Sequence, residues 1–399
     1  MQKNLFIGDY NYDLTPDKVA FFPLQQRDAS KLLVYKNQRI EDGNFSEIAS
    51  YVPTETVLVV NNTRVIEARL YFTKETGGRI EIFCLQPHHP AEMAMAMTQK
   101  VKVSWQCLIG GASKWKPGQV LEKELIIGTE KIIFKAKYIT KEEDHFIIEF
   151  GWDSDHSFSE ILHVAGNIPL PPYIKRNTEE LDKERYQTIF AIHEGSVAAP
   201  TAALHFTDEV FGKLAQNNCK REHITLHVGA GTFKPVKTET IADHVMHAEN
   251  FSVTLNTLKN LINAANIIAV GTTSLRTLES LYWMGVKVSN GINEFSITQW
   301  EAYEIDNSLT YKESLLAILN YMQINQQDVI NCSTSLLIIP GYEFKSASAI
   351  ITNFHQPRST LLLLIAAFIG DAWKNIYDHA LKNNYRFLSY GDSSLLFRK

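Results

Sequence analysis

Residues 267–285 read IIAVGTTSLRTLESLYWMG, and this stretch decides the class of fold. The run 267–270 has the apolar, β-branched character of a buried strand, and the residues after the GTTS turn have the spacing of a helix that we expect Gly285 to end. The same order recurs at 349–370, where AIIT leads through NFHQPRS into TLLLLIAAFIG. Strands that lead directly into helices predict a mainly parallel α/β sheet whose carboxyl-end loops converge on a ligand.

Residues 69–150 have a different texture. Short runs such as RIEIFCL, KIIFKAKYI and HFIIEF are separated by Gly-Gly and Pro-Gly turns, which is typical of an antiparallel sheet or a small barrel. We therefore predict an α/β protein in which a large, mainly α/β domain (residues 1–66 and 155–399) carries an inserted small antiparallel β-barrel-like domain (residues 67–154).

The composition is that of an ordinary globular protein. The formal net charge of −5 gives no global basic field for nucleic acid, although a local basic patch can still bind phosphates. The four cysteines lack the spacing of zinc or redox motifs, so we expect free thiols. The N-terminus lacks the apolar core of a signal peptide, and the longest apolar run, 361–369, is too short to cross a membrane. These features predict a cytoplasmic protein with no membrane partner.

Residues 195–207, GSVAAPTAALHFT, combine small side chains with hydrogen-bonding groups. Because small residues let the backbone approach a ligand closely, this segment and LHVGAGTF at 226–233 predict a wall of an active site. The polar side chains that the two segments contribute are His205, Thr207, His227 and Thr232.

The turn GTTS begins a predicted helix, where exposed amides favour a carboxylate or phosphate. Arg276, one turn into the helix, could add a bidentate contact to a carboxylate. Simple N-capping by Thr273 or Ser274 is the alternative, and it is favoured when this motif is taken alone.

Two other polar loops are candidates. NFHQPRST at 353–360 follows a buried strand, and its polar residues suit a functional or a surface role about equally. HVMHAE at 244–249 lacks the HExxH order and a third ligand, so we expect no metal there. A general base or a substrate contact at His247 or Glu249 fits this motif better.

Residues 167–176 and 184–191, NIPLPPYIKR and ERYQTIFA, interleave basic and aromatic side chains. Such interleaving suits the bases and phosphates of a single-stranded RNA loop, although a solvated basic surface is favoured on these residues alone. At the end of the chain, runs 385–388 and 395–397 look like two strands around a tight Gly391-Asp392 turn, with Asp392 a possible ligand contact.

Taken together, these segments resemble one family, the S-adenosylmethionine:tRNA ribosyltransferase-isomerases of queuosine biosynthesis. The resemblance runs from near the N-terminus to the end of the chain and is weakest in the inserted β-rich region. The matching pieces, in family order, are PLQQRDASKLLV, NNTRVIEARL, GNIPLPPYIKR, ERYQTIFA, GSVAAPTAALHFT, TLHVGAGTFKPV, HVMHAE, AVGTTSLRTLE, TNFHQPRSTLLLL and YRFLSYGD.

The chain departs from the family pattern in places. Asn62 stands where the family usually has Asp, which removes a carboxylate, so we expect no catalytic base at this position. Ala203 stands where Gly is usual, and Ser393-Ser394 follow Asp392 where the family usually continues Ala-Met. The segment 291–327 is an extra one, for which the sequence suggests no function.

The resemblance implies a reaction. The ribosyl part of S-adenosylmethionine is added to 7-aminomethyl-7-deazaguanine at the tRNA wobble position, which gives epoxyqueuosine-tRNA, adenine and methionine. It implies S-adenosylmethionine and tRNA as partners and no metal or redox cofactor, and we expect a monomer.

Roles for the candidate residues follow from that chemistry. Imidazole titrates near neutral pH, so four histidines are candidate proton carriers, with Glu249 a second-choice base. The expected catalytic residues are His205, His227, His247, Glu249 and His355. The expected S-adenosylmethionine contacts are Ser196, Ala199, Thr201, Gly229, Thr272, Thr273, Ser274 and Arg276. The expected tRNA contacts are Lys175, Arg176, Arg185 and Arg358.

Two other classes stay open. An S-adenosylmethionine-dependent tRNA methyltransferase is one, although the usual Gly-rich fingerprint after the first strand is missing. A tRNA-binding protein without catalysis is the other, in view of Asn62.

Overall fold

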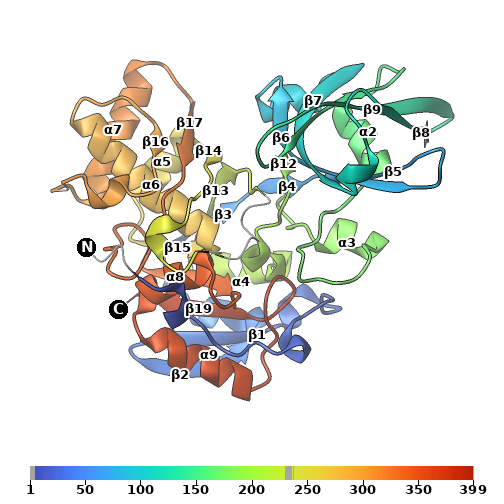
Figure 1. The fold of residues 1–399 in the computed structure, drawn as a ribbon. Helices are drawn as coiled ribbons and strands as arrows, with labels where there is room; N and C mark the ends of the chain where they lie inside the picture. The colour runs from blue at the N-terminus through green and yellow to red at the C-terminus, as the bar shows by residue number, and fades with distance from the viewer. Residues whose placement is uncertain (1–4, 230–235, 237, 307, 399) are drawn as a thin grey trace.

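The computed structural model describes residues 5–229, 236, 238–306 and 308–398, and it contains two sheets joined by a short two-stranded link (Figure 1). The large sheet has ten strands. In spatial order they are β16 (Ser296–Ile297), β17 (Val329–Thr334), β14 (Glu249–Thr254), β13 (Lys220–Leu226), β3 (Thr56–Asn61), β15 (Asn266–Val270), β18 (Ala349–Asn353), β19 (Ser393–Phe397), β1 (Lys31–Lys36) and β2 (Arg39–Asn44).

Parallel pairing forms the centre of the large sheet. Strands β13, β3, β15 and β18 run parallel to their neighbours in this group. Antiparallel pairs then extend the sheet on both sides, through β14 and β17 on one and β19 on the other. The predicted α/β class is confirmed, and the sheet is mixed rather than mainly parallel.

Strand β3 shows why the chain folds this way. All six of its residues, TVLVVN, are buried, as expected for a central strand with both faces covered. Val57 and Val59 pack against the helices on one face, while Leu58 and Val60 pack on the other, because successive side chains of a strand alternate.

Helices cover both faces of the large sheet. The first face packs against α5 (Leu255–Ile262), α6 (Thr272–Ser289), α7 (Tyr311–Ile324), α8 (Thr360–Ile369) and α9 (Ala372–Lys382). The second face packs against α4 (Asp208–Gln216) and the 3-10 helices η4 (Phe45–Ser50) and η6 (Thr201–His205). The other 3-10 helices within the described residues are η1 (Ile7–Asp9), η2 (Pro16–Lys18), η3 (Arg27–Ala29), η5 (Ala112–Lys114), η8 (Ile241–Asp243) and η9 (Glu301–Tyr303).

The smaller sheet is entirely antiparallel and curls around its own hydrophobic core (Figure 1). In spatial order its strands are β11 (Gly166–Asn167), β5 (Arg69–Thr73), β6 (Arg79–His89), β7 (Lys102–Gly110), β10 (Phe146–Gly151), β9 (Glu130–Lys141) and β8 (Val120–Ile127). The link to the rest of the chain is a parallel pair, β4 (Thr63–Val65) with β12 (His193–Ser196). Two short helices, α1 (Met93–Met97) and α3 (Glu180–Arg185), lie in the connecting segments.

Helix α2 (Phe158–Ala165) belongs to the core of the smaller sheet. Its Phe158, Ile161 and Leu162 are fully buried there, and β11 follows it directly to pair with β5. The smaller sheet and its core therefore include residues up to Asn167. The domain boundary at residue 154 was predicted from sequence texture and stays a prediction.

Gly285 lies inside α6, so the expected end of the helix at this residue is wrong. The helix continues to Ser289. A Cβ at position 285 would lie 2.2 Å from both the backbone oxygen and the Oγ of Ser314 on α7. Glycine at this position lets α7 pack closely on α6, and α7 comes from the extra segment 291–327, which also contains β16 and η9.

The expected terminal hairpin is also wrong. Residues 385–388 form no strand, and β19 lies between β18 and β1 inside the large sheet. Asp392 is buried, and its carboxylate accepts hydrogen bonds from the backbone amides of Lys31 and Arg386, at 3.1 and 2.8 Å. This carboxylate fixes the loop before β19 within the protein.

No single helix among the described residues is long and apolar enough to cross a membrane. Helices α8 and α9 together reach the required length and composition, but they meet at a bend of 114°.

The close packing of α6 on α7 makes a testable prediction. Gly285→Ala is expected to lower the free energy of unfolding by about 1–3 kcal/mol, because the added methyl overpacks against Ser314. The matched control is Gly212→Ala in α4, where a Cβ meets nothing within 4 Å. This change is expected to raise the free energy of unfolding by up to about 1 kcal/mol. Urea denaturation measures both, and equal effects at the two sites would contradict the packing argument.

Candidate active site

A pocket opens where the carboxyl ends of β15 and β18 meet the segment after β12. Its empty volume is about 740 Å³, counted out to the open mouth. Five of the predicted site residues line it, and they are Ala199, Thr201, Thr272, Thr273 and His355. Two of the loops that the sequence predicted to converge, GTTS and NFHQPRS, therefore do so, whereas residues 230–233 of LHVGAGTF lie outside the described residues. Other lining residues include Tyr173, Val228, Asn353 and Ser389.

The N-terminus of α6 faces this pocket. Gly271 is its N-cap residue and has no side-chain cap, so the alternative of capping by Thr273 or Ser274 is wrong. Within the described residues, the backbone amides of Thr272, Thr273 and Ser274 have no hydrogen-bond acceptor, and the buried Oγ of Ser274 has no partner. Unsatisfied amides at a helix start, with the helix dipole behind them, form a site for an anion.

Arg276 and Glu249 form a buried ion pair. Arg276 lies one turn into α6 and Glu249 begins β14. Neither side chain lines the pocket, so the guanidinium that was predicted to hold a carboxylate of the substrate holds one of the protein instead.

The Ser196 hydroxyl links two segments that line the pocket, one at Ala198 and one at Val228. It donates to the Ala198 oxygen at 3.0 Å and accepts from the Val228 amide at 2.9 Å. Gly229, half-buried, follows Val228. Thr207 caps α4 by accepting from the Val210 amide, and Thr232 lies outside the described residues.

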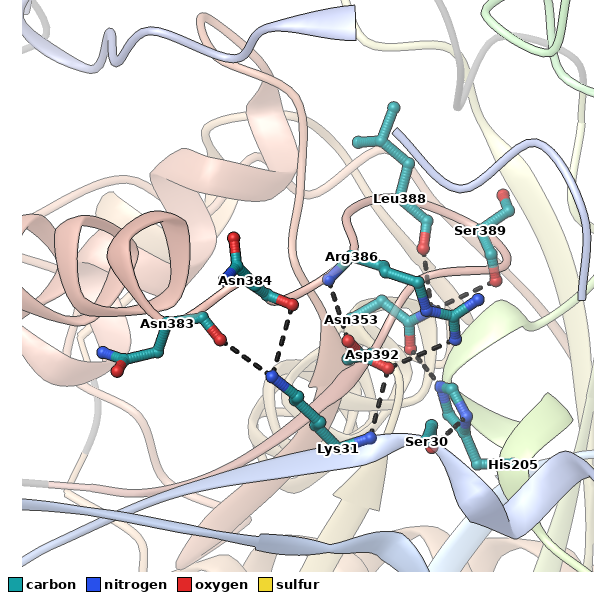
Figure 2. A network of polar contacts seen from close by, with 10 residues as sticks. All are labelled: Ser30, Lys31, His205, Asn353, Asn383, Asn384, Arg386, Leu388, Ser389 and Asp392. Atoms are coloured by element: carbon teal, nitrogen blue, oxygen red, sulfur yellow. Dashed lines mark hydrogen bonds and ion pairs between the residues drawn. The ribbon is translucent and has the colours of Figure 1, made fainter. Parts of the chain in front are cut away.

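His205 is a neutral imidazole with a defined tautomer (Figure 2). The Asn353 amide nitrogen donates to the oxygens of Leu388 and Ser389, so its Oδ1 must accept from His205 Nε2, at 3.1 Å. His205 Nδ1 is then the acceptor for the Ser30 hydroxyl, at 2.9 Å. Burial lowers the pKa of His205 to about 4, in keeping with this arrangement.

His355 is half-buried and lines the pocket. Its Nε2 lies 2.9 Å from the Thr352 Oγ1, and burial lowers the pKa of the ring to about 3. Its backbone is fixed by Tyr12, whose hydroxyl donates to the His355 oxygen, and by Tyr377, whose hydroxyl accepts from the His355 amide. His355 is thus a neutral imidazole held at the edge of the cavity.

His227 and His247 are not among the residues that line the pocket. The Nδ1 of His227 is buried and has no hydrogen-bond partner among the described residues, and burial together with His193 lowers the pKa of the ring to about 4. Gly195 lies between His227 and Met93 of α1, since a Cβ there would be 3.0 Å from His227 Nδ1 and 2.2 Å from Met93 Cγ. His247 is exposed in the loop before β14.

The four predicted tRNA contacts have different environments. Lys175 and Arg358 are exposed. Arg176 forms a bidentate pair with the buried Asp182, with both N–O distances 2.7 Å. Arg185 donates to the Gln25 oxygen and lines a second, smaller pocket.

That second pocket was not predicted. Its arginines include Arg27 and Arg386 beside Arg185, and Ser389 and His205 also line it. Arg27 lies in QQRDAS, part of the family-matching piece PLQQRDASKLLV. This basic residue was the sequence signal that could have indicated the second pocket.

The described residues contain no group of three His, Cys, Asp or Glu side chains that could hold a metal ion. All four cysteines are buried and free.

The chain matches known proteins along nearly its whole length. A family model described as "Queuosine biosynthesis protein" matches residues 7–396. Relatives named "S-adenosylmethionine:tRNA ribosyltransferase-isomerase" include one from Nitrosospira multiformis, 35% identical with 98% of each chain covered, and one from Thermotoga petrophila, 37% identical with 98% of this chain and 99% of the relative covered. The crystal structure of an S-adenosylmethionine tRNA ribosyltransferase from Thermotoga maritima matches at 27% identity and a TM-score of 0.46, over 98% of this chain and all of that one.

The protein is an enzyme, as the names of its curated relatives show, and its main pocket lies at the strand ends of the large sheet. The chain belongs to the queuosine biosynthesis protein family.

The depressed pKa of His205 predicts a pH dependence of stability. Between about pH 4 and 6.5 the unfolded chain binds a proton at this residue that the folded protein excludes, so stability falls as the pH falls through this window. We expect His205→Gln to reduce the slope of unfolding free energy against pH by up to about 1.4 kcal/mol per pH unit. Urea titrations from pH 6.5 to 4.5 measure the slope, and His88→Gln, at an exposed histidine of β6, is the control. Equal slopes in His205→Gln and the wild type would contradict the assignment.

Proposed function

We propose that the enzyme transfers the ribosyl part of S-adenosylmethionine to 7-aminomethyl-7-deazaguanine at the tRNA wobble position and isomerises it, which yields epoxyqueuosine-tRNA, adenine and methionine. Family membership supports the reaction class, and one observation supports the location. Free amides at the start of α6 and a neutral His355 face the same cavity. An anion-binding end and a proton acceptor are what a zwitterionic sulfonium substrate needs.

The start of α6 is proposed to bind the methionine carboxylate. The amides of Thr272, Thr273 and Ser274 supply the donors, and the helix dipole supplies a favourable field. Arg276 is already paired with Glu249, so its proposed part is to fix α6 relative to β14. The backbone at Ala199 and Thr201, where side chains are short, is proposed to contact the nucleoside.

His355 is proposed as the group that begins the chemistry. The sulfonium charge acidifies the hydrogens on the adjacent C5′, and removal of one starts the loss of adenine. His355 lines the cavity, and its low pKa keeps the ring unprotonated at neutral pH. The same low pKa makes the ring a weak base, so the acidity that the sulfonium gives to C5′ must drive the proton transfer. The aminomethyl nitrogen then adds to the activated sugar, and a ribose oxygen closes the epoxide and expels neutral methionine.

His205 is proposed as a positioning residue, because both of its ring nitrogens are engaged by Ser30 and Asn353. His247 stays the candidate for the acid that protonates adenine. Glu249 is paired with Arg276, and the pKa of His227, lowered to about 4, leaves that ring unprotonated at neutral pH. No metal or redox cofactor is needed in this scheme. Lys175 and Arg358, both exposed, are proposed to contact tRNA phosphates, while Arg176 is proposed to stabilise α3 through Asp182.

A product assay tests the proposed reaction. Labelled S-adenosylmethionine is incubated with the protein and tRNA that carries the aminomethyl base. Release of adenine and methionine in equal amounts is the expected result. S-adenosylhomocysteine would indicate a methyltransferase, and bound tRNA with neither product would indicate a binding protein; either outcome would overturn the proposal.

His355→Gln tests the proposed base. We expect kcat to fall about 10²–10⁴-fold, the usual contribution of a general base, while the Kd for S-adenosylmethionine changes little. His379→Gln on α9, which removes an imidazole paired with Asp42 at another surface, is the control. An unchanged kcat in the His355 variant would remove this residue from the mechanism.

A further inference from the structure

The second pocket gathers positive charge. Its empty volume is about 280 Å³, and the side chains of Arg27, Arg185 and Arg386 all line it. Arg386 is paired with the buried Asp392, at 3.2 Å. Neither Arg27 nor Arg185 forms an ion pair with a carboxylate anywhere in the part of the chain that the structure describes.

Backbone oxygens hold the two uncompensated guanidinium groups in place. Arg27 donates to the oxygens of Glu184, Arg185 and Leu204, and Arg185 donates to that of Gln25. The Nε of Arg185 is buried and, within the described residues, has no acceptor. Burial and the neighbouring charge of Arg185 lower the pKa of Arg27, because two like charges close together disfavour each other. The charge of Glu184 partly offsets this shift, but neither guanidinium pairs with a carboxylate among the described residues, so two fixed, half-buried cations form a site that an anion stabilises.

The two pockets share a wall. Ser389 lines both, and its hydroxyl lies 2.6 Å from the Tyr173 hydroxyl of the first pocket. His205 lines the second pocket and bonds to Asn353, which lines the first (Figure 2). An anion in the second pocket is therefore next to whatever reacts in the first.

An exposed aromatic residue is the chain neighbour of a residue that lines the second pocket. Phe22 is 51% exposed and immediately precedes Pro23, which lines the pocket. The Arg176 guanidinium lies 4.3 Å from the centre of its ring. An exposed ring beside fixed arginines is the pattern by which proteins hold an unpaired base and its phosphate.

We propose that Arg27 and Arg185 bind a backbone phosphodiester of the RNA substrate, next to the nucleotide that enters the first pocket. This proposal rests on the proposed function for the identity of the RNA. Paired arginine forks suit a phosphate, and the site would fix the register of the RNA strand so that a single nucleotide reaches the cavity. The methionine carboxylate has its own site at α6, so the two anions occupy separate pockets.

The test measures RNA binding without turnover. The probe is a hairpin RNA with the anticodon loop sequence, and its Kd is measured by fluorescence anisotropy over a range of salt concentrations. Arg185→Gln is expected to weaken binding about 10-fold and to reduce the slope of log K against log salt by about 0.7, the value for one lost contact to a single strand. Arg185→Lys, which keeps the charge, is expected to restore most of the slope.

Lys183→Gln is the matched control. Lys183 lies on the same helix, α3, and carries the same charge, but it pairs with Glu180 and does not line the pocket. Its slope is expected to equal that of the wild type. An equal loss of slope in the Lys183 and Arg185 variants would indicate a diffuse charge effect and overturn the proposal.

A second measurement needs no variant. Arginine-specific modification followed by mass spectrometry is run on the wild type with saturating hairpin RNA, or with S-adenosylmethionine alone. RNA is expected to protect Arg185 and leave exposed Arg39, at the far end of β1–β2, reactive. Protection by S-adenosylmethionine alone, or none by RNA, would overturn the proposal. Because neither measurement requires product, failure of the proposed reaction would be seen separately, in the product assay.

Discussion

The side-chain amide of Asn353 holds together the walls on which the site depends. Its nitrogen donates to the Leu388 and Ser389 oxygens at 2.9 and 3.1 Å, and its oxygen accepts from His205. The end of β18, the loop before β19 and η6 are thereby joined at one buried point (Figure 2). In a site of low dielectric each of these bonds is strong and costly to leave unmade, so this one amide stabilises the wall that the two adjoining pockets share.

Sequence patterns could predict where the site lies because topology alone brings strand ends together. The runs before GTTS and NFHQPRS became the neighbouring strands β15 and β18, and Thr273 and His355 therefore line one cavity. Patterns could not predict which charges are already neutralised. Arg276 pairs with Glu249 and Arg176 with Asp182, and whether such partners meet depends on packing that no local motif encodes.

Two misjudged elements share a cause. The sequence predicted that Gly285 ends a helix and that Gly391 lies in a hairpin turn. Both glycines in fact lie where another part of the backbone approaches, since a Cβ would be 2.2 Å from Ser314 or 2.5 Å from the Arg386 oxygen. The role of Asn62 also depends on a contact from a distant part of the chain, because its Oδ1 accepts a hydrogen bond from the Thr225 hydroxyl at 2.8 Å. A neutral amide fills that position without needing the counter-charge that a carboxylate requires.

Gly195 has a mechanical consequence for the molecule. The bare backbone of β12 is wedged between Met93, on a helix attached to the curled sheet, and the imidazole of His227, on the ten-stranded one. Any side chain at position 195 would displace Met93 or His227, so glycine lets both neighbours pack directly on the backbone of β12.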